Sequence, residues 1–289
     1  MTPPELLCRI EDCDVLDRES CRQFRELRTH LHDMLVGDDD HSVSRQITSL
    51  LWRDYTWCQL NECRIKLDAA GKTLNDGLLQ LLDQGFIANQ ALAIRRLVER
   101  KATRENRSVY SLYTSIDTLI ESDHLLTREN VICYNGAKFD GSGSTCLDQL
   151  SSHAHRAFDS MCDAPTGGRF DRLSTVKMKQ FGSHLSACDK MVEMANKVIA
   201  HASAPTNRGG VSGFSLDDLD RAYAAIIKVA QAISTRALFG PNVQFFPWIN
   251  YDQRHGLNVP FMNDLADQEI LDWSEARQQL YGQWGDAVL

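Results

Sequence analysis

Apolar residues recur at intervals of three and four along most of the chain, a pattern typical of helices that bury one face. In the segment 17–36, for example, Leu27, Leu31 and Leu35 share a face, and Gly37 is expected to end the helix. The same pattern predicts further helices, several of them opened by capping residues such as Ser215. The expected helices span residues 17–36, 42–71, about 76–100, 108–122, 145–162, about 179–202, 215–240 and 264–284.

Two stretches lack this periodicity. Residues 125–145 are predicted to be irregular, with a small hairpin around Val131–Tyr134 before the Asn135-Gly136 turn. Residues 242–260 are aromatic and irregular, and we expect them to lie across the bundle as a clamp. Because strand signals are sparse, the chain is predicted to be an all-α, multi-helix bundle with irregular insertions and a C-terminal helix.

The order of these elements suggests three divisions. Residues 1–41 are expected to form an N-terminal helical extension. Residues 42–240 are expected to form the helical core, with the irregular insertion at about 125–145, and residues 241–289 the clamp and the C-terminal helix. Within the core, Trp52, Tyr55 and Trp57 surround the second helix, where packing inside the protein is favoured over a platform that stacks nucleic-acid bases.

Composition narrows the functional classes. The 289 residues are 43% hydrophobic and 24% charged, as in ordinary globular proteins, and the net charge of -8 disfavours nonspecific binding to nucleic acid while allowing a local basic cleft. The nine cysteines are scattered and none forms a Cys-x-x-Cys pair, which disfavours zinc and redox motifs and suits a reducing compartment. Without a signal peptide or an apolar run of membrane-spanning length, a cytoplasmic location away from membranes is expected.

A run of acids at Asp38-Asp39-Asp40-His41 is a candidate for binding a divalent cation. No further carboxylate is spaced to close such a site, so an acidic loop that caps the following helix is the favoured interpretation. We therefore predict no metal site and no cofactor.

The main candidate for chemistry is the end of the helix expected at 179–202. Lys197 and His201 are four residues apart and therefore share a face, and Asn196 lies beside them. One interpretation is a helix end, where Lys and His offset the partial negative charge of the last carbonyls. The other is a functional site.

The run Ala195-Asn196-Lys197-Val198-Ile199-Ala200-His201 resembles the end of the third helix in proteins of the HEPN superfamily, in particular its abortive-infection (AbiU-type) branch. The likeness in helical arrangement extends over roughly Ser42 to Gly240. The family motif has an arginine where this chain has Ala195. The resemblance implies metal-independent cleavage of RNA in bacterial stress or phage defence, and a homodimer that pairs the motif helices.

Basic residues near the third helix extend this hypothesis. A run of basic residues follows Arg95 and Arg96. This run is either a solvated helix end or a rim that binds phosphate. The missing guanidinium of the family motif is expected from Arg95 or Arg96, because the planar fork of arginine fits phosphate. We assign substrate binding to Arg95, Arg96, Arg104 and Arg208.

Three functions remain open from the sequence. The first is an endoribonuclease in which His201 exchanges the proton, Lys197 holds a phosphate oxygen and Asn196 completes the site. The second is a catalytically inactive HEPN-like module that binds RNA, a nucleotide or a protein partner, which Ala195 favours. The third is a helical interaction protein in which His201 caps a helix.

Overall fold

The computed structural model describes residues 8–72, 76–100, 109–143, 146–199, 213–240, 245 and 267–286. This part of the chain contains helices and turns, with no strand and one isolated β-bridge between Thr127 and Arg172, so the predicted all-α bundle is confirmed. None of the helices in these ranges combines the length and apolar composition needed to cross a bilayer. The α-helices are α1 (Arg18–Val36), α2 (Val43–Ala69), α3 (Asp76–Leu97), α4 (Leu112–Glu121), α5 (Arg128–Cys133), α6 (Cys146–Met161), α7 (Thr175–His184), α8 (Asp189–Met194), α10 (Leu216–Ala232) and α12 (Asp267–Asp286).

Local capping fixes where several helices begin. The Asp17 carboxylate accepts hydrogen bonds from the backbone amides of Glu19 and Ser20 at the start of α1. At the start of α10, Ser215 and Asp218 form the reciprocal capping box that the sequence predicted. Each such cap satisfies backbone donors that have no partner within the helix, so these boundaries are encoded locally.

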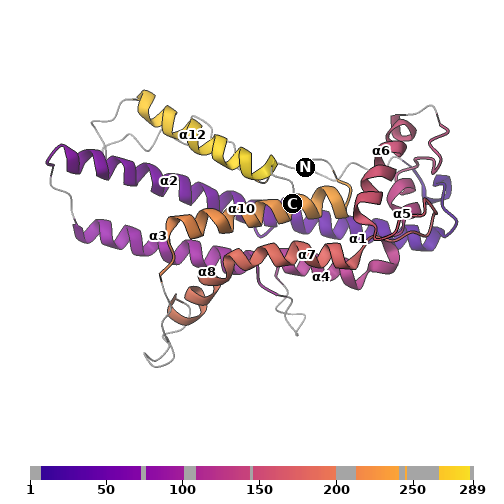
Figure 1. The fold of residues 1–289 in the computed structure, drawn as a ribbon, viewed down its shortest axis with the longest axis horizontal. Coiled ribbons are helices and arrows are strands. Elements are labelled where there is room, and N and C mark those ends of the chain that lie inside the picture. The colour runs from indigo at the N-terminus through magenta and orange to yellow at the C-terminus, as the bar shows by residue number, and fades with distance from the viewer. Residues whose placement is uncertain are drawn as a thin grey trace.

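The long helices lie roughly parallel to one another (Figure 1). α2 and α3 form an antiparallel pair, and α10 runs alongside α2. α7 and α8 pack on the other side of α10 and α3, while α12 lies along α2 and α10. The shorter helices α5 and α6 gather at the opposite end of the molecule from the α2–α3 connection.

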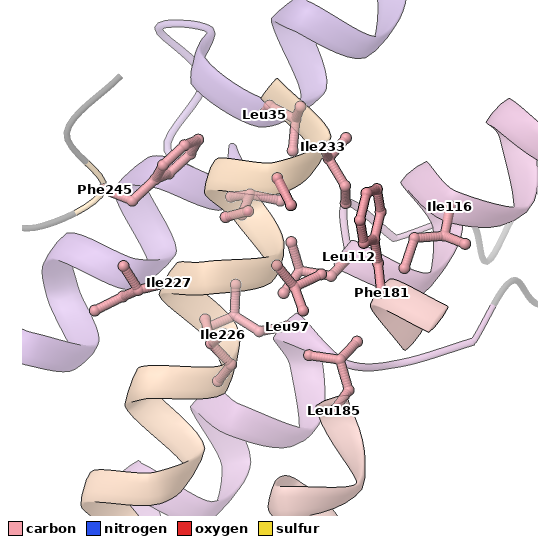
Figure 2. Close-up of a cluster of buried hydrophobic side chains, with 14 of the residues drawn as sticks. Leu35, Leu97, Leu112, Ile116, Phe181, Leu185, Ile226, Ile227, Ile233 and Phe245 are labelled. Atoms are coloured by element: carbon pink, nitrogen blue, oxygen red, sulfur yellow. The ribbon is translucent and has the colours of Figure 1, made fainter. Parts of the chain in front are cut away.

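The hydrophobic core is centred on α10, which is buried on most of its faces. Ile226 and Ile227 are at most 1% exposed and point to different neighbours. Figure 2 shows side chains from α1, α3, α4, α7 and the segment after it converging on this helix. One continuous cluster joins residues from all three expected divisions, for example Leu31, Ile226 and Tyr281. The N-terminal and C-terminal helices therefore complete the same core.

The aromatic residues of α2 pack inside the protein. The Trp57 ring stacks on Phe86 of α3 with centroids 4.5 Å apart, and Trp52 stacks on Tyr55 at 5.5 Å. Tyr55 is 1% exposed. Trp52 and Trp57 are half-buried and pack against the core, so these contacts support the packing interpretation of the aromatic residues.

The helix expected at about 179–202 begins earlier and is interrupted. Ser174 caps α7, which starts at Thr175, and a 3-10 turn, η4 (Leu185–Cys188), separates α7 from α8. The Tyr113 hydroxyl donates a hydrogen bond to the carbonyl of Gly182 over 3.0 Å. That carbonyl also accepts the shorter-range bond from Leu185, so the regular α-helical ladder breaks here. A Cβ at Gly182 would lie 3.1 Å from the Tyr113 ring, which is why a glycine suits this contact.

The prediction of a hairpin in the segment 125–145 is wrong. Its residues 128–133 form the short helix α5, which Thr127 caps by accepting from the Asn130 amide. All six residues of α5 are buried, including Arg128, Glu129 and Asn130. The apolar periodicity of the sequence did not indicate this helix, because several of the side chains that α5 buries are polar. Of the expected clamp at 242–260, only Phe245 lies within the described residues, and it is 1% exposed.

Candidate functional site

Two of the three residues predicted to be catalytic lie on a π-helical turn. Asn196 and Lys197 belong to η5 (Ala195–Ile199), which continues directly from α8, and both side chains are half-buried. Lys197 Nζ forms an ion pair with Glu193 Oε1 at 2.6 Å, one turn earlier. π-helical turns are rare and are found frequently at functional sites. His201, the third predicted residue, lies outside the described residues.

Ala195, which stands where the HEPN motif has its arginine, is fully buried. Ala195 is 0% exposed and belongs to the hydrophobic core. Its side chain therefore points away from solvent, whereas Lys197 is 41% exposed. A guanidinium attached at position 195 would enter the core instead of facing a substrate.

The arginines expected to substitute for the motif arginine, Arg95 and Arg96, lie in the last turn of α3. α3 packs against α8 and η5, so the expected neighbourhood of these helices is present. However, the two run antiparallel (Figure 1). The guanidinium of Arg100, just past the end of α3, stacks 4.0 Å from the Tyr113 ring, and Tyr113 bonds to Gly182. The residue that follows this end of α3 thus reaches Gly182 only through Tyr113 of α4, and Gly182 precedes Ile199 by roughly 25 Å of helix.

Of the four arginines predicted to bind substrate, the structure describes Arg95 and Arg96. Arg95 is half-buried and Arg96 is exposed, and both lie in the last turn of α3. Arg104 and Arg208 lie outside the described residues.

The acidic run after α1 forms a turn. Asp39 Oδ1 accepts a hydrogen bond from the His41 amide over 2.6 Å, and Gln46 of α2 donates to the His41 carbonyl. The acidic side chains are exposed. Among the described residues, no group of three or more His, Cys, Asp or Glu side chains is arranged to hold a metal ion.

A buried charge network joins α5 to α6 and to the loop before α7. Arg128 is 1% exposed; it donates to Asp159 and Asp171 and lies 4.7 Å from the Phe158 ring. Burial alone would raise the pKa of the Asp171 carboxyl, but hydrogen bonds from Thr166 and Arg128 outweigh it and lower this pKa to about 2. The buried guanidinium of Arg128 is thus paired with two carboxylates from other segments, and the network holds the insertion in place.

A cavity of about 390 Å³ opens between α2 and α12, in the size range of small-ligand sites. The buried Gln59 donates from Nε2 to the Tyr55 hydroxyl over 2.6 Å, while its Oε1 has no hydrogen-bond partner among the described residues. Side chains that line the cavity include Tyr55, Cys58, Gln59 and Glu62 of α2 and Trp273, Ala276 and Arg277 of α12.

Beside the cavity, an ion-pair cluster fixes α12 to the bundle. Arg277 donates from Nε and Nη2 to Asp54 Oδ2, over 3.0 and 2.5 Å, and from Nη2 to Asp220 of α10 over 3.1 Å. The Tyr281 hydroxyl donates to the same Asp54 oxygen over 2.8 Å. Asp54 is 1% exposed, so its charge is satisfied by α12 instead of by water. The cluster holds the cavity wall in a fixed geometry.

Burial controls the protonation of the groups around this cavity. Burial, reinforced by the Asp54 charge, raises the pKa of the Cys58 thiol to about 12, so the sulfur is protonated and a poor nucleophile at neutral pH. Burial also raises the pKa of Asp220, and the Arg277 guanidinium opposes that rise.

Sequence reasoning missed this site although one signal was available. Asp54 follows Leu50 and Leu51 by four and three residues, so it falls on the apolar stripe of α2. A charged residue in a buried stripe needs a partner. The partner, Arg277, lies 223 residues later, on a helix that was predicted only as an acidic terminal element.

We compared the chain with known protein families, curated proteins and solved structures. Neither family models, curated proteins nor solved structures yield a match to this chain. The resemblance to HEPN proteins thus rests on the short run that ends at His201, and any function has to be argued from the residues themselves.

Proposed function

We propose that the protein is a helical binding module whose ligand occupies the cavity between α2 and α12. The observation that carries this proposal is a cavity of about 390 Å³ whose lining includes the buried Gln59, a side chain whose Oε1 has no hydrogen-bond partner among the described residues. A buried acceptor without a partner is destabilising by about 1–3 kcal/mol. A ligand whose hydrogen-bond donor reaches this oxygen recovers that free energy, which favours its binding.

Binding without chemistry is the better fit to the groups present. The Cys58 thiol is protonated, and the Asp54 carboxylate is held by Arg277 and Tyr281. Neither is available as a nucleophile or as a general base. The same interactions keep the lining in one conformation, which reduces the entropy lost on binding.

A blocking substitution tests the proposal. We expect Ala276→Trp to fill the cavity and to abolish the thermal stabilisation that small ligands give the wild-type protein. Fragments of low molecular mass, screened by thermal shift, should raise the wild-type Tm by about 2–4 °C at roughly ten times their Kd. Gln279→Trp adds the same side chain at an exposed position of α12 that does not line the cavity, and it should keep the response. Equal responses in all three proteins would place the binding elsewhere and refute the proposal.

A second candidate function is RNA binding or cleavage of the HEPN type at the end of the α8–η5 segment. The π-helical turn that presents Asn196 and Lys197 favours it, together with the resemblance that includes His201. In this function, His201 moves the proton, Lys197 contacts a phosphate oxygen, and two copies pair their motif segments as a homodimer. The buried Ala195 favours the non-cleaving form, because the position of the motif arginine holds an alanine within the core.

RNA cleavage by matched variants tests this second function. If the protein is a nuclease, His201→Ala should lower cleavage of single-stranded RNA by about 100-fold or more, since proton transfer contributes at least that much. Lys197→Ala should have a smaller effect, and a chelator none. Equal activity of the wild type and His201→Ala would assign the cleavage to a contaminant. Sedimentation velocity at micromolar concentration measures the expected homodimer.

A further inference from the structure

We infer that the cavity between α2 and α12 selects a small organic cation: a protonated amine carried on a compact apolar or aromatic body. The inference rests on the proposed binding function and adds the chemical class of the ligand. It follows from three independent features of the lining, which are the unpaired acceptor, the excess of negative charge and the aromatic walls.

The acceptor defines which polar group the ligand presents. Gln59 is 4% exposed, its Nε2 donates to the Tyr55 hydroxyl, and its Oε1 has no hydrogen-bond partner in the part of the chain that the structure describes. A ligand group that satisfies Oε1 has to be a hydrogen-bond donor. Glu62 lies one turn further along α2, on the same face, and also lines the cavity. Two acceptors on one wall favour a group with several N–H donors, such as an ammonium.

The charges around the cavity point the same way. Three carboxylates, those of Asp54, Asp220 and Glu62, lie in or next to the lining. Arg277 is engaged by the first two. No ion pair joins Glu62 to another described residue, so this carboxylate remains to attract a cation. An anionic ligand would meet Glu62, while Arg277 is already bonded to two acids and the Lys66 ammonium is held over the Trp273 ring.

The apolar walls define the body of the ligand. The Tyr55 and Trp273 rings and the Leu280 side chain line the cavity. Lys66 Nζ already lies 4.5 Å from the centroid of the Trp273 ring, which shows that this ring accepts an ammonium at its face. Because Lys66 holds that position, we assign the ligand's ammonium to Gln59 and Glu62 and its body to the rings and Leu280.

Three probes with one body and different head groups test the inference. Isothermal titration of the full chain with 2-phenylethylamine, 2-phenylethanol and phenylacetate compares a cation, a neutral donor and an anion. We expect the amine to bind at least tenfold more tightly than either of the others. Tighter or equal binding of 2-phenylethanol or phenylacetate would overturn the cation assignment and leave the cavity function standing. If none of the probes binds, and fragments also fail to stabilise the protein, both proposals are refuted.

Variants of the two acceptors locate the effect. Glu62→Gln removes the rim charge at constant shape, and Gln59→Met removes the acceptor at similar volume. Each should weaken binding of 2-phenylethylamine by about tenfold, the usual contribution of a hydrogen bond to a charged group, and should change binding of phenylacetate little or improve it. Glu11→Gln removes an exposed carboxylate outside the cavity and serves as the charge control. Amine binding that is equally tight in Glu62→Gln, Gln59→Met and Glu11→Gln would contradict the assignment.

Discussion

Asp54→Ala is expected to lower the free energy of unfolding by about 3 kcal/mol. The substitution leaves the guanidinium of Arg277 with Asp220 alone and deprives the Tyr281 hydroxyl of its closest acceptor. Breaking a fully buried ion pair typically destabilises by about 3–5 kcal/mol, and we expect the lower end because the Arg277 side chain is 18% exposed. Urea unfolding followed by circular dichroism measures the change.

A matched exposed pair provides the control for Asp54. Glu193→Ala removes the partner of Lys197, and both of those side chains are more than 40% exposed. Its expected effect is below about 0.5 kcal/mol, as for other solvent-exposed pairs one helical turn apart. If Asp54→Ala and Glu193→Ala shift the urea midpoint equally, the cluster does not anchor α12.

Ala195→Arg is expected to destabilise the protein by about 3 kcal/mol or more and to confer no RNA cleavage. Position 195 restores the arginine of the HEPN motif in sequence, but Ala195 is 0% exposed within the core. Arginine there both overfills the packing and buries an unpaired charge. Thermal unfolding and RNA cleavage, measured on the same preparation, report the two effects.

Lys197→Arg is the control for this substitution. It introduces the same guanidinium two residues away, at a side chain that is 41% exposed, and should change stability by less than about 0.5 kcal/mol. A well-folded Ala195→Arg protein that cleaves RNA, and loses that activity with His201→Ala, would contradict the buried orientation of residue 195 and establish the nuclease function.

The sequence was sufficient for those parts of the fold that local rules determine. Asp17 and Ser215 cap helices through bonds to residues two or three positions away, and the apolar stripes of α1 and α10 repeat at helical spacing. The 3-10 turn after α7 was not predictable in this way. It depends on the hydroxyl of Tyr113, which reaches Gly182 from another helix.

The candidate sites show the same division. Asn196 and Lys197 are adjacent in sequence, so their proximity was certain, but their orientation relative to Ala195 was not, because a π-helical turn changes which residues share a face. The cavity forms only because α2 and α12 pack against each other. Nothing in a single sequence indicates that residues 54 and 277 are in contact. Likewise, the burial of Arg128 depends on acids from two other segments.

The bond between Asp54 and Arg277 also sets an order of events during synthesis. The two residues are 223 positions apart, so at about 5–20 residues per second the ribosome exposes Asp54 roughly 10–45 s before its partner emerges. Until then, burial of that part of α2 would leave a carboxylate without its counter-charge, which disfavours early closure of the bundle around it. The nascent chain is therefore expected to finish its core last at α12, and the stretch of α2 around Asp54 is where a chaperone would find it open.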